Sequence, residues 1–106
     1  MNKRFMLIRP SKPHAAIVNK LKALEYFMAS CEEGSFARAA QRLEVSVPAV
    51  QKLVSALEDS LGFALLERGS RGVRPTPAGS EYIDRCRPLL IEIEELAQAE
   101  RALRGT

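Results

Sequence analysis

The sequence predicts a mainly α-helical fold: a winged helix-turn-helix of three helices and a two-stranded wing, followed by a long helix. Two helical segments, Ser35 to Leu43 and Ser46 to Leu61, are separated by only two residues, and a basic loop between glycines follows at 68–74. Apolar residues then recur every three or four positions as far as Leu103. A tight helix pair of this kind can hold one helix out from a small domain, where it fits a DNA major groove.

Charge is distributed unevenly along the 106 residues, although the formal net charge is only +3. The first twenty positions contain five basic residues and no acidic one, and further basic residues surround the predicted helix-turn-helix. Residues 92–100, by contrast, contain four glutamates. This placement suits phosphate binding. Aromatic residues make up 6% of the chain, which is too few for a protein that stacks single-stranded bases.

Neither catalysis nor metal binding is predicted. Cys31 and Cys86 stand among apolar neighbours at helical spacing, as small core residues do, and His14 is the only histidine. We therefore expect no enzyme, no cofactor and no metal. The apolar run at 5–8 is too short for a signal peptide and no segment is long enough to span a membrane, so we expect a cytoplasmic protein.

The chain divides into a flexible basic arm at 1–19, a winged helix-turn-helix at 20–76 and a linker helix at 77–104. The arm has no apolar periodicity, and its basic residues either contact DNA phosphates or have no role. Apolar residues from Leu21 to Cys31 recur at three- and four-residue steps, which predicts a first helix of about three turns.

Start and stop signals define the next two helices. Gly34 is expected to cap the first helix in a left-handed conformation, and Ser35 and Ser46 are expected N-caps. Pro48 fits the first turn of the third helix, because its missing N–H costs nothing there. Gly62 is expected to end that helix.

The third helix has two faces when residues are placed about 100° apart. The face expected to point into the core carries Val50, Val54, Leu57 and Leu61. The opposite face carries Pro48, Gln51, Lys52 and Ser55. This outer face offers polar groups near the positive end of the helix dipole, which suits DNA and also suits a merely solvated surface.

A short hairpin is expected next, with strands Leu65–Glu67 and Val73–Arg74 around a four-residue tip. Arg71 in the tip is suited to a minor groove, where negative potential is concentrated. Two further arginines are expected to hold phosphates, Arg68 and Arg74. A surface hairpin that is merely basic is the alternative.

The last helix is expected to start with Thr76 as N-cap and Pro77 at its first position. A spacing of 3.5 residues predicts a coiled-coil seam for dimerisation, made by Tyr82, Cys86, Leu89, Ile93, Leu96 and Leu103. A helix of about 26 residues is roughly 39 Å long, so we expect a second copy to cover it. Pro88 removes a backbone hydrogen bond and is expected to bend the helix.

Six motifs occur in a fixed order. They are Leu21-x-x-Leu24-x-x-Phe27, Glu33-Gly34-Ser35-Phe36-x-Arg38-Ala39-Ala40-x-x-Leu43, Val45-Ser46-x-Pro48-Ala49-Val50, Leu57-Glu58-x-x-Leu61-Gly62, Leu65-Leu66-Glu67-Arg68 and Thr76-Pro77-Ala78-Gly79. Together they resemble the N-terminal DNA-binding domain of LysR-type transcriptional regulators. The resemblance implies binding to a partly symmetric double-stranded DNA site by a homodimer, or a tetramer in a full-length form, whose linker helices pair antiparallel.

The resemblance and the predicted faces together give one set of expected DNA contacts: Ser35, Arg38, Ser46, Val47, Pro48, Gln51, Lys52, Ser55, Arg68, Arg71 and Arg74. In such proteins an effector-sensing domain follows the linker helix, so a small-molecule effector is expected to act only through a C-terminal domain that this chain lacks. We expect a fragment, with a natural short form as the alternative.

The helix expected to read DNA departs from the family at two places. Val47 stands where the family commonly has glutamine, and Gln51-Lys52-Leu53 replaces a common Ser-Arg-Gln. Val47 can contact a thymine methyl and Gln51 can pair with adenine, so we expect DNA binding with a different base preference. A winged-helix interaction module that no longer reads DNA is the alternative; Val47 and Leu53 favour it, whereas Lys52 and Arg68 oppose it.

Overall fold

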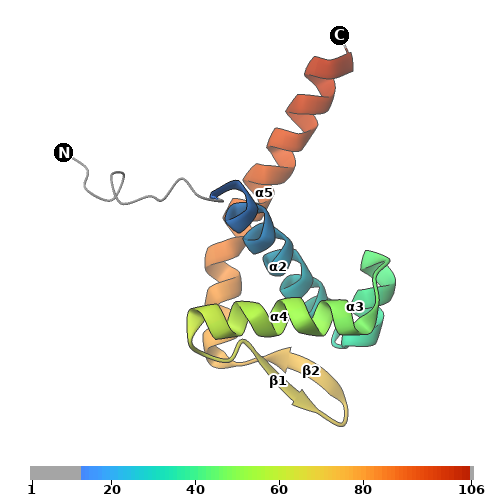
Figure 1. Ribbon diagram of the computed structural model, residues 1–106, viewed down its shortest axis with the longest axis vertical. Coiled ribbons are helices and arrows are strands. Elements are labelled where there is room, and N and C mark those ends of the chain that lie inside the picture. The colour runs from blue at the N-terminus through green and yellow to red at the C-terminus, as the bar shows by residue number, and fades with distance from the viewer. Residues whose placement is uncertain (1–12, 106) are drawn as a thin grey trace, which may run out of the picture.

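The computed structural model describes residues 13–105, and Figure 1 shows its elements. Their order is α2 (Pro13–Glu33), α3 (Phe36–Leu43), α4 (Val47–Leu61), β1 (Leu66–Gly69), β2 (Gly72–Pro75) and α5 (Pro77–Gly105). Helices α2, α3 and α4 pack together beside the hairpin, and α5 extends beyond them (Figure 1). The predicted winged helix-turn-helix followed by a long helix is confirmed.

Helix α2 begins earlier than the sequence predicted. It is a helix of 21 residues from Pro13, whereas the expected arm reached residue 19 and the expected helix had about three turns. Proline is well tolerated at a first helical position, and the alanines that follow it favour a helix. The predicted boundary is therefore wrong, and the rest of the expected arm, residues 1–12, lies outside the described residues.

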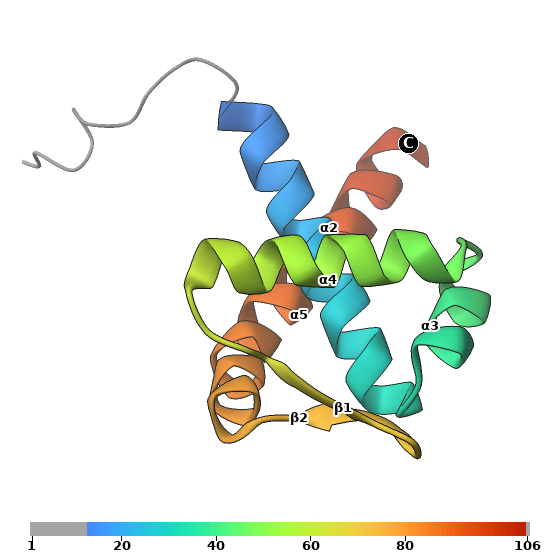
Figure 2. The ribbon, with the colours of Figure 1, turned by 60° about the horizontal axis from the view of Figure 1, so that its bottom comes forward.

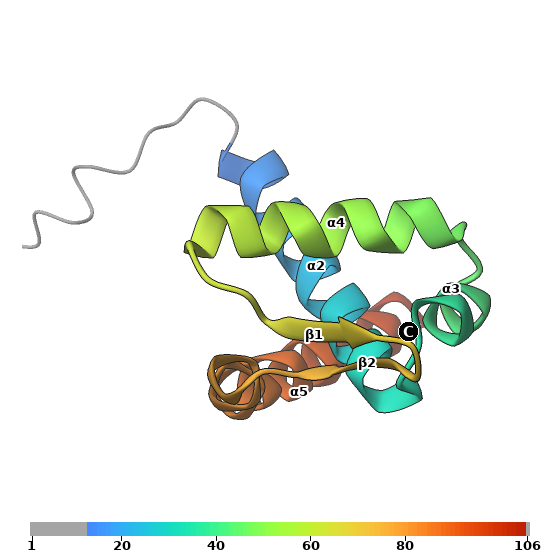
Figure 3. The ribbon, with the colours of Figure 1, turned by 90° about the horizontal axis from the view of Figure 1, so that it is seen from below.

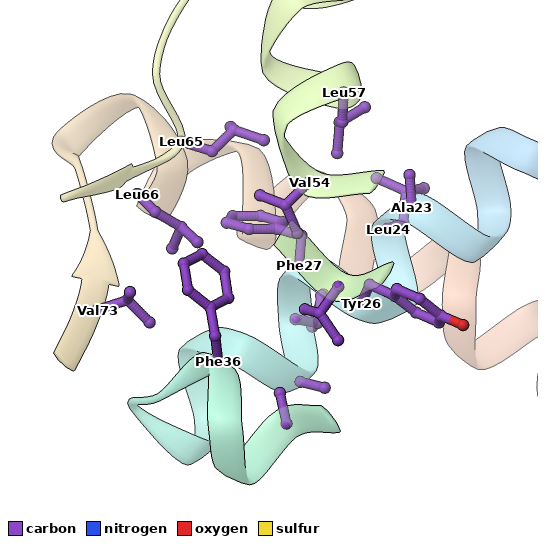
Figure 4. Packing of buried hydrophobic residues seen from close by; sticks show 14 of the residues in the cluster. Ala23, Leu24, Tyr26, Phe27, Phe36, Val54, Leu57, Leu65, Leu66 and Val73 are labelled. Atoms are coloured by element: carbon purple, nitrogen blue, oxygen red, sulfur yellow. The ribbon is translucent and has the colours of Figure 1, made fainter. Parts of the chain in front are cut away.

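Phe27 of α2 is fully buried, and the hydrophobic core to which it belongs draws residues from every other helix and from both strands (Figure 4). The buried apolar residues outside α2 are Phe36, Ala39, Ala40, Val50, Val54, Leu57, Leu65, Leu66, Val73 and Cys86. Ala39 and Ala40 lie where α3 meets α2 and α4, and their small side chains let the helix axes approach closely. This core fixes the helix pair against the hairpin.

The turn between α3 and α4 is set by local hydrogen bonds. The hydroxyls of Ser35 and Ser46 each accept a hydrogen bond from the amide three residues later, at 3.1 and 3.2 Å, so both predicted N-caps are confirmed. Glu44 ends α3 with φ at 60°, a left-handed conformation that glycine or asparagine more often adopts. Val45 packs against the core, as predicted.

The strands of the hairpin are longer than predicted. Gly69 pairs with Gly72 across the sheet, so the tip consists of two residues, Ser70 and Arg71. The four-residue tip expected from the sequence is wrong, because both glycines continue the antiparallel strands. The amide of Val73 donates to the carbonyl of Gly34 at 3.0 Å, which attaches β2 to the turn between α2 and α3.

Helix α5 has the predicted start, since the amide of Gly79 donates to Oγ1 of Thr76 at 2.9 Å. It spans 29 residues and continues through Pro88, which therefore does not end it. Two residues assigned to the dimer seam pack inside the protomer instead: Cys86 is buried in the core, and the Tyr82 ring contacts the Phe27 ring. No helix among the described residues is both long and apolar enough to span a membrane.

Replacing Gly72 with alanine should destabilise the protein more than the same change at Gly69. Gly72 has φ at 114°, and a Cβ there would overlap the carbonyl oxygen of Gly34, whereas a Cβ on Gly69 would meet open space. Backbone strain of this kind costs about 1–3 kcal/mol. Urea unfolding of both variants measures the loss in the free energy of unfolding, and equal losses would contradict this account of the hairpin.

Candidate nucleic-acid interface

Helix α4 turns one face to the core and the other to solvent, as its sequence predicted. Val50 and Val54 are fully buried, and Leu57 is 4% exposed. Gln51 and Lys52, on the other side, are both exposed. The apolar residues thus leave the amide and the ammonium on the outside of the domain.

The outer face is narrower than expected. Val47 and Ser55 are half-buried, and Val47 packs against the core together with Leu53. These residues lie on the flanks of the buried stripe, where neighbouring elements cover part of each side chain. Val47 therefore offers less surface to a ligand than the sequence suggested, and Leu53 does not form an exposed apolar spot.

Three elements meet at one end of the molecule. Figures 2 and 3 place α3, the N-terminal end of α4 and the hairpin tip on the same side. Ser35, Ser46 and Pro48 lie where the helices begin, Ser46 and Pro48 being exposed and Ser35 half-buried. Backbone amides at a helix start attract anions, and the dipole adds to this attraction.

Exposed cations without ion-pair partners lie on these elements. Among residues 13–105, no ion pair forms at Arg38 of α3, Lys52 of α4 or Arg71 of the hairpin tip. All three side chains are exposed. They are free to bind an anionic ligand such as a nucleic-acid backbone.

The other two predicted arginine contacts are already paired within the protein. Arg74 contacts Glu67 at 3.2 Å, with 82% and 52% of the two side chains exposed. Arg68 contacts Glu58 at 3.1 Å, and its guanidinium lies 5.3 Å from the centre of the Phe36 ring. Both charges are partly neutralised, which the sequence did not reveal because each partner lies on another element or strand.

Glu58 has a structural role in this region that the sequence did not predict. It belongs to a quoted motif, but no periodicity or composition signal gave it a role. Its carboxylate accepts hydrogen bonds from the amides of Leu65 and Leu66, at 2.7 and 3.1 Å, in addition to the Arg68 contact.

A further arginine, Arg42 of α3, is used for packing the helices together. Its guanidinium contacts Glu32 at 2.8 Å and Glu33 at 3.3 Å on α2. Hydrogen bonds to these two carboxylates raise the pKa of Arg42 above its ordinary value. Arg42 therefore belongs to the α2–α3 contact.

The cysteines are core residues, as predicted. Cys86 is buried and Cys31 packs against the core. Burial, with a smaller effect of Glu32, raises the pKa of Cys31 to about 11, and burial also raises the pKa of Cys86. Among the described residues, no group of His, Cys, Asp and Glu is arranged to hold a metal ion.

Helix α5 exposes a row of apolar side chains beyond the core. Four seam residues are exposed, with exposures of 54% for Leu89, 39% for Ile93, 57% for Leu96 and 75% for Leu103. Ile91 is also exposed, at 53%, but lies on a different face of the helix. The row is thus a second candidate interface, shorter than the six-residue seam that the sequence predicted.

Comparison with known proteins gives one consistent family. A family model described as "Bacterial regulatory helix-turn-helix protein, lysR family" matches residues 21–80. The HTH-type transcriptional regulator TfdS of Cupriavidus pinatubonensis is 44% identical over 71 residues, which cover 67% of this chain and 24% of that protein. The chain therefore spans about a quarter of the length of this relative.

Solved structures give the same result. A crystal structure of a CbnR_DBD–DNA complex has 39% sequence identity and a TM-score of 0.69, and the match covers 77% of this chain and 94% of that one. A complex of BenM_DBD with benA site 1 DNA has 36% identity and a TM-score of 0.71, with coverages of 78% and 96%. Both structures show a domain of this fold in complex with DNA.

Both thiols should react slowly with a disulfide reagent in the folded protein at mildly alkaline pH. The thiolate is the reactive form, and a raised pKa reduces its fraction about tenfold per unit. Burial raises the pKa of Cys31 to about 11, so its reaction rate should still increase with pH at values well above the pKa of an ordinary thiol. Rates comparable with those of the urea-unfolded chain would contradict the burial described above.

Proposed function

We propose that this chain, which belongs to the lysR family of bacterial regulatory helix-turn-helix proteins, binds double-stranded DNA. It does so sequence-specifically, as the dimeric DNA-binding module of a transcription regulator. The observation that carries the proposal is the outer face of α4, which exposes Gln51 and Lys52 on the side of the molecule that also holds α3 and the hairpin tip (Figure 2). Arg38 of α3 and Arg71 of the tip are exposed there and form no ion pair with any described residue. The similar domains of CbnR and BenM were solved with DNA.

The start of α4 is proposed to enter the major groove, which is wide enough for a helix. Gln51 offers an amide that can bind the N6 and N7 edge of adenine with two hydrogen bonds. Lys52 provides a charge without the planar fork of arginine, which suits a phosphate or a guanine acceptor. Ser55 and Val47 contribute less in this proposal, since both are half-buried.

Contacts to phosphates are proposed to fix the position of the module on the duplex. Arg38 and the amides at the starts of α3 and α4 lie at the same end of the molecule as the hairpin tip (Figure 2). Arg71 at that tip is suited to the minor groove, because it is exposed and no described residue neutralises it.

Dimerisation is proposed to occur through the exposed row on α5. Leu89, Ile93 and Leu96 are exposed on α5, and a second copy would remove them from water. Two copies related by twofold symmetry would place two α4 helices on a partly symmetric DNA site. In the longer regulators that this proposal implies, an effector-sensing domain follows α5, and the full-length protein can form a tetramer.

The alternative is an interaction module that does not read DNA. It has little support, because Val47 and Leu53, the two apolar residues on or near the reading helix that favoured it, pack against the core.

Selection from a random pool of DNA duplexes tests the proposed function. The protein should enrich duplexes with two related half-sites, and binding should weaken steeply as salt rises, since phosphate contacts release counterions. A pool that stays random after repeated rounds, with no salt-dependent retention, would refute the proposal.

Gln51→Ala should change base preference at one position of each half-site and cost roughly 1–3 kcal/mol there. Gln98→Ala is a matched control, because Gln98 is an exposed glutamine on the distal half of α5. Anisotropy titrations with a panel of single-base duplex variants measure the effect. The assignment of Gln51 fails if its variant keeps the wild-type profile.

Changing Leu89 and Ile93 to glutamate should produce monomers, because two charges would lie in the proposed contact. Ile91→Glu is the control: Ile91 has similar exposure but lies on another face of α5. Sedimentation equilibrium measures the mass, and a duplex with two half-sites should lose affinity in parallel. Dimers that persist in the double variant would place the contact elsewhere.

A further inference from the structure

The hairpin is connected to α4 by the carboxylate of one residue. Glu58 lies in the last turn of α4, and its Oε2 accepts hydrogen bonds from the amides of Leu65 and Leu66, where the chain enters β1. Only 15% of the Glu58 side chain is exposed. The base of the hairpin is therefore attached to the helix proposed to read DNA.

Arg68 connects the same carboxylate to a third element. One guanidinium nitrogen contacts Oε1 of Glu58 at 3.1 Å, while the guanidinium lies 5.3 Å from the Phe36 ring centre, which belongs to α3. Phe36 is buried, so its position is set by the core. A planar guanidinium suits this arrangement, because it can stack on a ring and still donate in its own plane.

From these contacts we propose that Arg68 and Glu58 are positioning residues, which hold the hairpin at a fixed place relative to α3 and α4. This inference rests on the proposed DNA binding and revises one expectation from the sequence: Arg68 acts through Glu58 and Phe36 and does not serve as a phosphate contact. The free cation at the tip, Arg71, is then presented in a constant orientation.

The neighbouring ion pair shows why the arrangement is specific. Arg74 and Glu67 also form an ion pair, but their side chains are 82% and 52% exposed, and neither hydrogen-bonds to a backbone amide. The Arg68–Glu58 pair has exposures of 46% and 15% and uses both carboxylate oxygens. An exposed pair contributes little, whereas a carboxylate that joins three groups restricts their relative motion.

The direction in which Glu58→Gln changes DNA affinity distinguishes a positioning role from a purely electrostatic effect. Glu58→Gln removes a negative charge near the proposed DNA surface, so electrostatics alone predicts tighter DNA binding. Positioning predicts the opposite: the amide cannot hold the guanidinium as the carboxylate does, and affinity should fall roughly two- to fivefold, as for the loss of a partly exposed ion pair. Glu67→Gln is the matched control and should leave affinity unchanged or raise it.

Arg68→Ala should reduce DNA affinity by a similar factor, and adding Glu58→Gln should reduce it no further. The slope of log K against log salt should stay at the wild-type value, whereas Lys52→Ala, which removes a cation without an ion pair, should lower it by about one. A slope lowered by about one in Arg68→Ala, or tighter binding by Glu58→Gln, would overturn the proposal.

Hydrogen exchange in the free protein tests the connection without DNA. The amides of Leu65 and Leu66 should exchange faster in Arg68→Ala than in Arg74→Ala, while core amides keep their protection and show that both variants fold. Equal exchange in the two variants would refute the connection. A wild-type protein that binds no DNA would refute the proposed function, and the exchange result would still decide whether Arg68 fixes the hairpin.

Discussion

The burial of one face of α4 determines the rest of the arrangement. Val50, Val54 and Leu57 are buried because α2 and α3 pack against α4, and Phe27 of α2 belongs to the same buried cluster (Figure 4). A helix of 3.6 residues per turn then has to present Gln51 and Lys52 outward. The orientation of the proposed DNA contact is thus a consequence of core packing. In the free protein the two polar side chains stay in water, so no desolvation free energy is lost until a ligand binds.

Local signals in the sequence were sufficient for much of this fold. Ser35 and Ser46 cap their helices through the amides three residues away, and the two faces of α4 follow from helical spacing, so these features needed no knowledge of distant contacts. Glu44 could not be predicted, because a left-handed glutamate is imposed by the tight turn and not by its own preference. The early start of α2 was missed because the prolines and basic residues of the first twenty positions indicated an arm, although Ile17 continues the helical spacing of Leu21 and Leu24.

The contacts that the sequence did not reveal at the candidate sites have a tertiary origin. Arg68 was expected to hold phosphate because it lies beside a basic tip, and its partners, Glu58 and Phe36, are brought to it by separate helices. In the same way the 3.5-residue spacing on α5 continues into Cys86, which the core of the protomer buries. A single apolar periodicity therefore continues from the core of the domain into the proposed dimer contact, and the sequence alone does not mark where one ends and the other begins.

The most direct test of the central claim is to map backbone amide shifts by NMR as a DNA duplex is added to the protein at low salt. The account predicts that the perturbed amides belong to the start of α3, the first turns of α4 and the hairpin tip, with the distal half of α5 unaffected at constant oligomeric state. Perturbations confined to α5 or to the exposed side of α2, with α4 unchanged, would contradict it.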